Sequence, residues 1–165
     1  TEIYTLSLHD ALPILKKIFS IILCGILLFG IAGCKSTNNF DIGGVSDITI
    51  NDNSNVSLSI KDKTLKNTGV TLILENDSDK LLRYDEYYKM DIKKDKEWHT
   101  INVELYFDDP LWGVKQNSKE EFELNWEYGY GRLAPGEYRI IKKVYFETDT
   151  SEEEPFYVST EFMIN

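Results

Sequence analysis

Few residues in this sequence have the types and spacing that catalysis requires. The chain has 2 His, and the one in its main body, His99, follows Trp98 in a segment of alternating residue types. A histidine that acts as a general base needs an oriented nucleophile within reach, and neither a Gly-x-Ser-x-Gly nor a Ser-x-x-Lys motif follows position 34. Asp108 and Asp109 are adjacent carboxylates before Pro110, an arrangement more typical of a turn than of an acid–base pair. We therefore expect that the protein is not an enzyme.

Metal and cofactor sites are equally sparse. With 2 Cys and 2 His, a single chain cannot assemble a zinc ribbon or finger. Asn51, Asp52 and Asn53 offer oxygen ligands that suit calcium, but the glycine and the distal glutamate of a calcium loop are missing. The acidic run 152–154 before Pro155 is more typical of a solvated turn than of a cation site. We expect no metal site, and no cofactor other than a covalent lipid.

The composition indicates one acidic domain with an apolar segment attached. The chain has 165 residues, of which 42% are hydrophobic and 13% aromatic, which is too apolar for a disordered protein. Its 18 basic and 28 acidic side chains give a net charge of −10, which would be repelled by nucleic-acid phosphates. We expect no nucleic-acid partner, and the composition leaves the oligomeric state open.

The apolar segment has the layout of an export signal. Residues 18–32 carry no charge over fifteen positions and follow Lys16 and Lys17. A membrane-spanning helix needs about 20 apolar residues, so this run is short for a permanent anchor. Two lysines, a short apolar core and then small residues are typical of a secretory signal peptide. We predict such a peptide, helical in conformation, over residues 15–33, and interpret Cys24 inside it as a small hydrophobic residue.

The end of this run reads Ile31-Ala32-Gly33-Cys34 and is followed by polar residues. It resembles the lipobox of bacterial lipoproteins. The resemblance implies a diacylglycerol joined to Cys34 through a thioether, cleavage before Cys34, and a chain anchored by lipid at the extracytoplasmic face of the cell membrane. Two acyl chains provide stable anchoring that one chain does not. An ordinary signal peptide with an incidental Cys34 and an uncleaved anchor are the open alternatives.

These features divide the chain into four parts. Residues 1–14 precede the basic start of the signal and resemble translated sequencing read-through, so we expect a non-native segment, with a genuine extension as the alternative. Residues 34–46 contain Ser, Thr, Asn and the pair Gly43-Gly44, which predicts a flexible tether. Residues 47–165 have the size of one compact domain.

Alternation of apolar and polar residues dominates this predicted domain. Apolar residues share one parity in four segments: 56–60, 70–74, 122–126 and 156–164. We also expect segments 87–94 and 98–107 to form a hairpin across Lys94-Asp95-Lys96-Glu97. Because no window keeps a helical spacing, the pattern predicts an all-β fold, an antiparallel sandwich of about seven to nine short strands.

One turn is more specific than the rest. Pro135-Gly136 stands just before a predicted strand that opens with Tyr138. In immunoglobulin-like sandwiches a tyrosine at such a corner returns its hydroxyl to the backbone, and we predict this structural role for Pro135, Gly136 and Tyr138.

Several segments together resemble the bacterial Ig-like domain 14 family over roughly residues 56–164. They are Val70–Asn76, the tyrosine-rich stretch Tyr84–Met90, Trp98, Trp126–Gly129, Leu133–Ile140 and Phe156–Phe162. The resemblance implies an immunoglobulin-like sandwich in an extracytoplasmic protein, of a family with many lipoproteins from low-GC Gram-positive bacteria. It supplies no catalytic residues.

Aromatic residues are the candidates for binding. A predicted strand-to-loop junction contains Trp126, Tyr128 and Tyr130. The fourth candidate, Trp112, precedes this junction in the sequence. Exposed rings with acidic neighbours can stack on a sugar or dock a protein, whereas buried rings would belong to the core. We therefore expect a lipoprotein whose non-catalytic domain has a structural role or interacts with a protein or cell-envelope partner. The alternative is a small-ligand or glycan-binding lipoprotein that uses these four aromatic residues.

Overall fold

The computed structural model of the chain describes residues 40–51, 55–107, 110–147 and 154–165. The expected non-native segment, the predicted signal peptide and lipobox, Cys34, the pair Asp52-Asn53 and the pair Asp108-Asp109 lie outside these residues. The described part contains nine strands and one short helix: β1 (Asp41–Val45), β2 (Val56–Ile60), β3 (Gly69–Asn76), β4 (Leu81–Lys94), β5 (Glu97–Asn102), β6 (Trp112–Val114), β7 (Ser118–Asn125), α2 (Glu127–Tyr130), β8 (Gly136–Glu147) and β9 (Phe156–Ile164).

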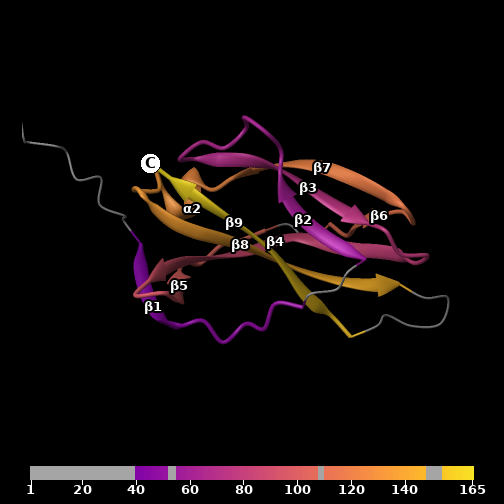
Figure 1. Ribbon diagram of the computed structural model, residues 1–165, viewed down its shortest axis with the longest axis horizontal. Helices are drawn as coiled ribbons and strands as arrows, with labels where there is room; N and C mark the ends of the chain where they lie inside the picture. Colours follow the sequence, from indigo (N-terminus) through magenta and orange to yellow (C-terminus); the bar gives the residue numbers. More distant parts are fainter. Residues whose placement is uncertain (1–39, 52–54, 108–109, 148–153) are drawn as a thin grey trace, which may run out of the picture. The chain divides into compact units, whose positions relative to one another are not determined.

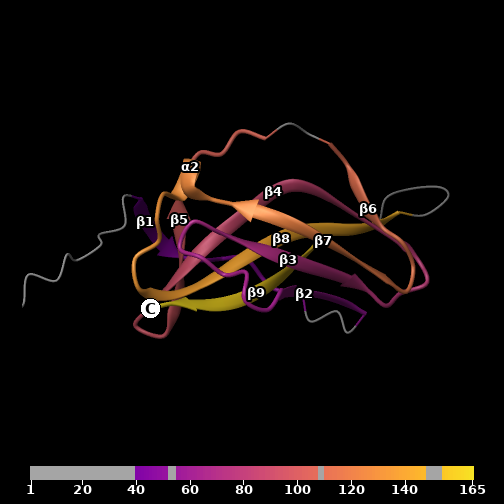
Figure 2. The same cartoon turned by 90° about the horizontal axis from the view of Figure 1, so that it is seen from above.

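The strands form two antiparallel sheets that lie one over the other (Figures 1 and 2). The larger sheet has the order β1-β5-β4-β8-β9, with β6 paired to the beginning of β4. The smaller sheet has the order β2-β3-β7. This arrangement confirms the predicted all-β antiparallel sandwich.

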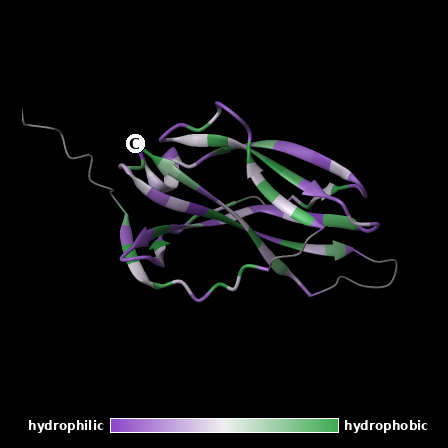
Figure 3. Ribbon diagram, in the orientation of Figure 1, coloured by the Kyte–Doolittle hydropathy of each residue, from purple (hydrophilic) through white to green (hydrophobic). Residues whose placement is uncertain are grey.

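The core lies between the sheets and is built by the alternation seen in the sequence. Hydrophobic and hydrophilic bands alternate along the strands in Figure 3. In β3, Val70, Leu72 and Leu74 are buried, and in β8 Ile140 and Val144 are buried on the same parity as Tyr138. Burying these side chains contributes roughly 25 cal/mol for each Å² of apolar surface removed from water, so the two inner faces hold the sheets together.

The predicted hairpin is present as the β4–β5 pair, but its second strand ends at Asn102 and not at residue 107. Lys94 lies opposite Glu97, so Asp95 and Lys96 form a two-residue turn. Both turn residues have positive φ, 51° and 72°, as the mirror-image turns favoured in tight hairpins require. β4 also begins earlier than the alternation suggests, at Leu81, because a bulge after Tyr84 interrupts its periodicity.

Tyr138 makes the corner contact expected from the sequence. Its ring is fully buried, stacks on Phe162 with centroids 5.6 Å apart, and its hydroxyl donates to the Ala134 carbonyl at 2.9 Å. A Cβ on Gly136 would lie 3.3 Å from the Tyr138 ring, which explains why glycine follows Pro135. The turn therefore lets the ring fold back over the chain.

Replacing Tyr138 by phenylalanine tests this corner. Tyr138→Phe removes the hydroxyl but keeps the stacked ring, so we expect a loss of about 1–2 kcal/mol in the free energy of unfolding, typical of one buried hydrogen bond. Urea unfolding measures it as a lower midpoint with an unchanged slope. An unchanged midpoint would show that the hydroxyl contact does not stabilise the domain.

The predicted tether is wrong over its second half. Residues 41–45 form β1, which pairs with β5 and places Asp41 opposite Asn102 and Ile42 opposite Ile101. The two glycines that suggested flexibility lie where the register of this pair shifts, and a Cβ on Gly43 would lie 3.0 Å from the Asn102 side chain. Glycine here serves close packing of strands rather than flexibility.

The segment after β1 is also attached to the larger sheet. The buried Arg139 guanidinium binds the buried Asp91 carboxylate at 2.7 Å and donates to the Ser46 hydroxyl at 3.2 Å. The same guanidinium lies over the Trp98 ring, with the Arg139 Cζ atom 5.0 Å from the ring centroid. The folded domain therefore includes residues 41–46, which the prediction assigned to the tether.

Candidate functional site

The sandwich has a groove of about 480 Å³ along one side, between β4 and β7. We call it the β4–β7 groove. Its lining comes from four strands and the segment before β6: Tyr84, Asp85, Glu86, Tyr88, Phe107, Trp112, Glu120, Glu121, Phe122, Glu123, Leu124, Asn125 and Lys142. Aromatic rings and carboxylates therefore share one concave surface.

A bulge in β4 forms one wall of this groove. Tyr84 lies opposite Val144 and Tyr88 lies opposite Lys142, so three residues of β4 face a single residue of β8. Extra residues in a bulge leave the regular ladder of backbone hydrogen bonds. Their carbonyl groups then need other donors.

Lys142 supplies those donors from the inner face of the larger sheet. Its ammonium group donates to the carbonyl of Asp85 and, at 2.8 Å, to the carbonyl of Tyr87. The Nζ atom also lies over the rings of Tyr84 and Phe122, 5.5 and 5.7 Å from their centroids. Only 1% of this residue is exposed. Burial lowers the pKa of Lys142 from 10.5 to about 8, against the opposing influence of nearby carboxylates.

Aromatic side chains form the apolar surface of the groove. Tyr84 and Phe122 stack across the two sheets with centroids 5.3 Å apart, and Tyr88 packs against Phe107 at 5.6 Å. Burial, and secondarily the charge of Glu120, raises the pKa of Tyr84; burial also raises that of Tyr88. Both phenols are therefore neutral at physiological pH. Trp112, which pairs with Tyr84 across β6 and β4, remains 51% exposed.

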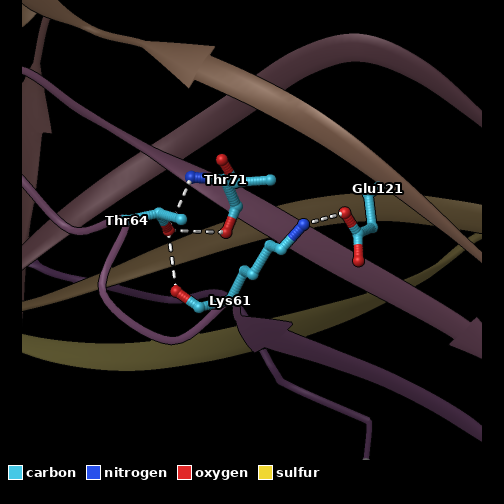
Figure 4. Close-up of polar contacts among 4 residues, drawn as sticks. All are labelled: Lys61, Thr64, Thr71 and Glu121. Carbon is cyan, nitrogen blue, oxygen red and sulfur yellow. Dashed lines mark hydrogen bonds and ion pairs between the residues drawn. The ribbon is translucent and has the colours of Figure 1, made fainter.

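Five carboxylates give the groove a negative rim. Asp85 and Glu86 belong to the bulge, and Glu120, Glu121 and Glu123 belong to β7. Glu121 is neutralised by the Lys61 ammonium, whose Nζ lies 2.5 Å from its Oε2 (Figure 4).

Lys61 is held in place by the turn that follows β2. The Thr64 hydroxyl donates to the Lys61 carbonyl at 2.7 Å and accepts from the Thr71 amide at 3.1 Å (Figure 4). These bonds attach the turn to β3. With Lys61 on Glu121 and Lys142 at the base, the five carboxylates still outnumber the cations of the groove.

The four aromatic residues predicted to bind a ligand do not form one surface. Trp126 is fully buried, and its indole Nε1 donates to the Asn67 carbonyl at 2.9 Å. Tyr130 is 3% exposed and packs against Tyr88. Tyr128 is fully exposed on α2, and only Trp112 lines the groove. The prediction of one binding cluster is wrong because the chain turns into α2 after Trp126, which points alternate rings into the core.

His99 has a structural contact. Its ring Nδ1 lies 3.2 Å from the Gly43 carbonyl, so it links β5 to β1. Over the described ranges, no group of three or more His, Cys, Asp or Glu side chains is arranged to hold a metal ion. No helix in those ranges has the length and apolarity to cross a membrane.

Sequence reasoning missed most of the groove. Tyr84, Phe122 and Lys142 come from segments far apart in the sequence, and the stacking of the sheets brings them together. One signal was available, because Lys142 has the same parity as the buried residues Tyr138, Ile140 and Val144. A lysine on an otherwise apolar parity indicates a buried charge with a specific partner.

Comparisons with known proteins address the domain type. A family model described as a bacterial Ig-like domain matches residues 52–157. A crystal structure of a protein from Archaeoglobus fulgidus is similar over 67% of this chain and 95% of that chain, with 12% sequence identity and a TM-score of 0.26, a score too low to support an argument. No curated protein matches the chain.

Proposed function

Because the chain belongs to the bacterial Ig-like domain family, we propose that it is a membrane-anchored lipoprotein that displays a non-catalytic Ig-like domain outside the cytoplasm. The observation that carries this proposal is the order of the parts, in which an Ig-like sandwich follows the lipobox-like residues Ile31–Cys34. The family match supports the non-catalytic part of this proposal. A diacylglycerol on Cys34 would hold the domain at the extracytoplasmic face of the membrane.

The anchor in this proposal is short. Five residues separate Cys34 from Phe40, where the described domain begins. An extended chain covers at most about 3.6 Å per residue, so Phe40 lies within roughly 20 Å of the lipidated cysteine. The domain would then work close to the membrane, where neighbouring envelope proteins are its accessible partners.

Metabolic labelling with palmitate tests the anchor. We expect the wild type to incorporate labelled palmitate and to begin at Cys34, because the cysteine thiol is the acceptor. Cys34→Ala should incorporate none, whereas Cys24→Ala, a matched control inside the apolar run, should label normally. An unlabelled wild type, or a membrane form that retains residues 18–33, would overturn the lipoprotein assignment.

The β4–β7 groove is the surface that we propose for partner binding. It combines a half-exposed Trp112 with stacked rings and with five carboxylates, of which only Glu121 has an ion pair among the described residues. Binding energy commonly concentrates at aromatic residues in such concave surfaces. A glycan or small ligand has less support, because the aromatic platform expected for it is divided between core and surface: Trp126 and Tyr130 are buried. An interaction with a protein partner fits the groove better.

A further inference from the structure

The smaller sheet ends at β7, and the groove follows this strand. Among the described residues β7 pairs with β3 and with no strand on its other side. Six consecutive residues of β7, 120–125, line the groove, which at about 3.3 Å per residue gives a length near 20 Å. A free strand edge presents a row of backbone donors and acceptors that another extended chain can pair with.

The side chains of β7 indicate what an added strand would carry. Phe122 and Leu124 have the inner parity, beside the stacked rings of the groove, and Glu120 shares that parity; Glu121 and Glu123 have the outer parity. Cross-strand neighbours share a face. A matching strand would therefore alternate apolar residues toward the groove with basic residues toward the outer carboxylates.

The charge on both walls of the groove supports the same conclusion. Asp85 and Glu86 of the bulge and Glu120 of β7 line the groove, and none of them has an ion-pair partner within the described ranges. Lys142 offsets one negative charge, and its ammonium is directed to two bulge carbonyls. The groove therefore remains acidic and attracts a basic occupant.

The acidic edge also disfavours a second copy of this chain. Pairing β7 with another β7 would bring an edge with three glutamates within Glu120–Glu123 against an equally acidic one, and like charges directly opposite each other destabilise a strand pair. The same charges that disfavour pairing of two β7 edges favour a strand of opposite charge.

We propose that the β4–β7 groove binds an extended basic segment of a partner protein, which adds to the free edge of β7 as a fourth strand of the smaller sheet. This inference rests on the proposed interaction function of the groove. The backbone of β7 supplies the pairing, Tyr84, Phe122 and Trp112 contact the apolar side chains, and the carboxylates bind the basic ones.

Fluorescence anisotropy with a labelled peptide of alternating lysine and valine, in non-ionic detergent with the full chain, tests the proposal. We expect saturable binding that weakens as salt is raised. The double variant Glu120→Gln/Glu123→Gln should bind about three- to tenfold more weakly, since exposed charge pairs have modest energies. The matched double variant Glu75→Gln/Glu97→Gln, away from the groove, should bind like the wild type.

Backbone pairing requires a second control. We expect at least one of two N-methylated peptides, methylated on the lysine or on the valine amides, to lose binding, because one of these sets faces β7 in an added strand. A peptide with glutamate in place of lysine should not bind. Full binding of both methylated peptides, equal loss in the two double variants, or absence of binding by the basic peptide would overturn the proposal.

The two proposals fail separately. Cys34→Ala lacks the lipid acceptor but keeps the groove, so it should bind the peptide like the wild type. Binding by this variant together with an unlabelled wild type would refute the anchor and support the groove. A labelled wild type that does not bind the peptide would refute strand addition and leave the lipoprotein assignment intact.

Discussion

Trp126→Ala is expected to lower the free energy of unfolding by about 3–5 kcal/mol, the usual range for truncating a buried tryptophan. The Trp126 ring is fully buried and stacks on Phe162 with centroids 5.7 Å apart. Its indole N–H also donates a hydrogen bond to the Asn67 carbonyl. Alanine would remove all these contacts and leave a cavity beside Phe162. Chemical denaturation of the two proteins measures the difference.

Trp112→Ala is the matched control for this experiment. Trp112 is half exposed in the groove, so its loss should cost less than about 1 kcal/mol, as for most surface substitutions. In the peptide-binding assay, by contrast, Trp112→Ala should weaken peptide binding clearly, although the protein remains folded. Equal destabilisation by the two substitutions would contradict the assignment of Trp126 to the core and of Trp112 to the surface.

The second large effect concerns pH. Between pH 7 and pH 10 the wild type should gain about 2–3 kcal/mol in stability relative to Lys142→Met, because Lys142 loses its charge within this range. Its pKa is about 8 in the folded chain, against an ordinary value of 10.5, owing to burial. Methionine has a similar length but no titratable group.

The sign follows from proton binding. Below pH 8 lysine is protonated in both states, and the cost of burying its charge is fully present. Between pH 8 and 10.5 the unfolded chain binds more protons than the folded chain, so stability rises with pH. The buried phenols Tyr84, Tyr88 and Tyr130 have raised pKa values and act in the opposite direction above about pH 10. Both proteins contain these tyrosines, so most of the tyrosine contribution cancels when the free energy of unfolding of Lys142→Met is subtracted from that of the wild type.

Urea unfolding of both proteins at intervals between pH 7 and pH 10 measures this difference. Parallel curves for the wild type and Lys142→Met would show that the ammonium is not buried as the structure places it. A rising wild-type curve would identify the β4 bulge as a place where the fold retains a costly charge. That charge is balanced by two bulge carbonyls and two rings.

Local patterns were sufficient for the architecture. Period-two alternation identified β2, β3 and β9, the polar stretch Lys94–Glu97 identified the β4–β5 hairpin, and Pro135-Gly136 identified the Tyr138 corner. Each of these features depends on residues adjacent in the chain. Glycine was the least reliable indicator of local structure. The pair Gly43-Gly44 is compatible with a flexible segment, but in the structure it lies in the irregular edge strand β1.

The sequence by itself therefore determined the sandwich, its family and the lipobox-like stretch for which we propose lipidation, since all three are written in short, contiguous patterns. Only the tertiary structure decided which aromatic rings are buried and where a partner can bind. Trp126 continues the parity of Phe122 and Leu124, but Tyr130 is the last residue of α2, where strand alternation has ended and no short pattern distinguishes an inward ring from an outward one. The groove exists because β4, β6, β7 and β8 bring side chains from distant segments together, and their proximity depends on how the two sheets stack.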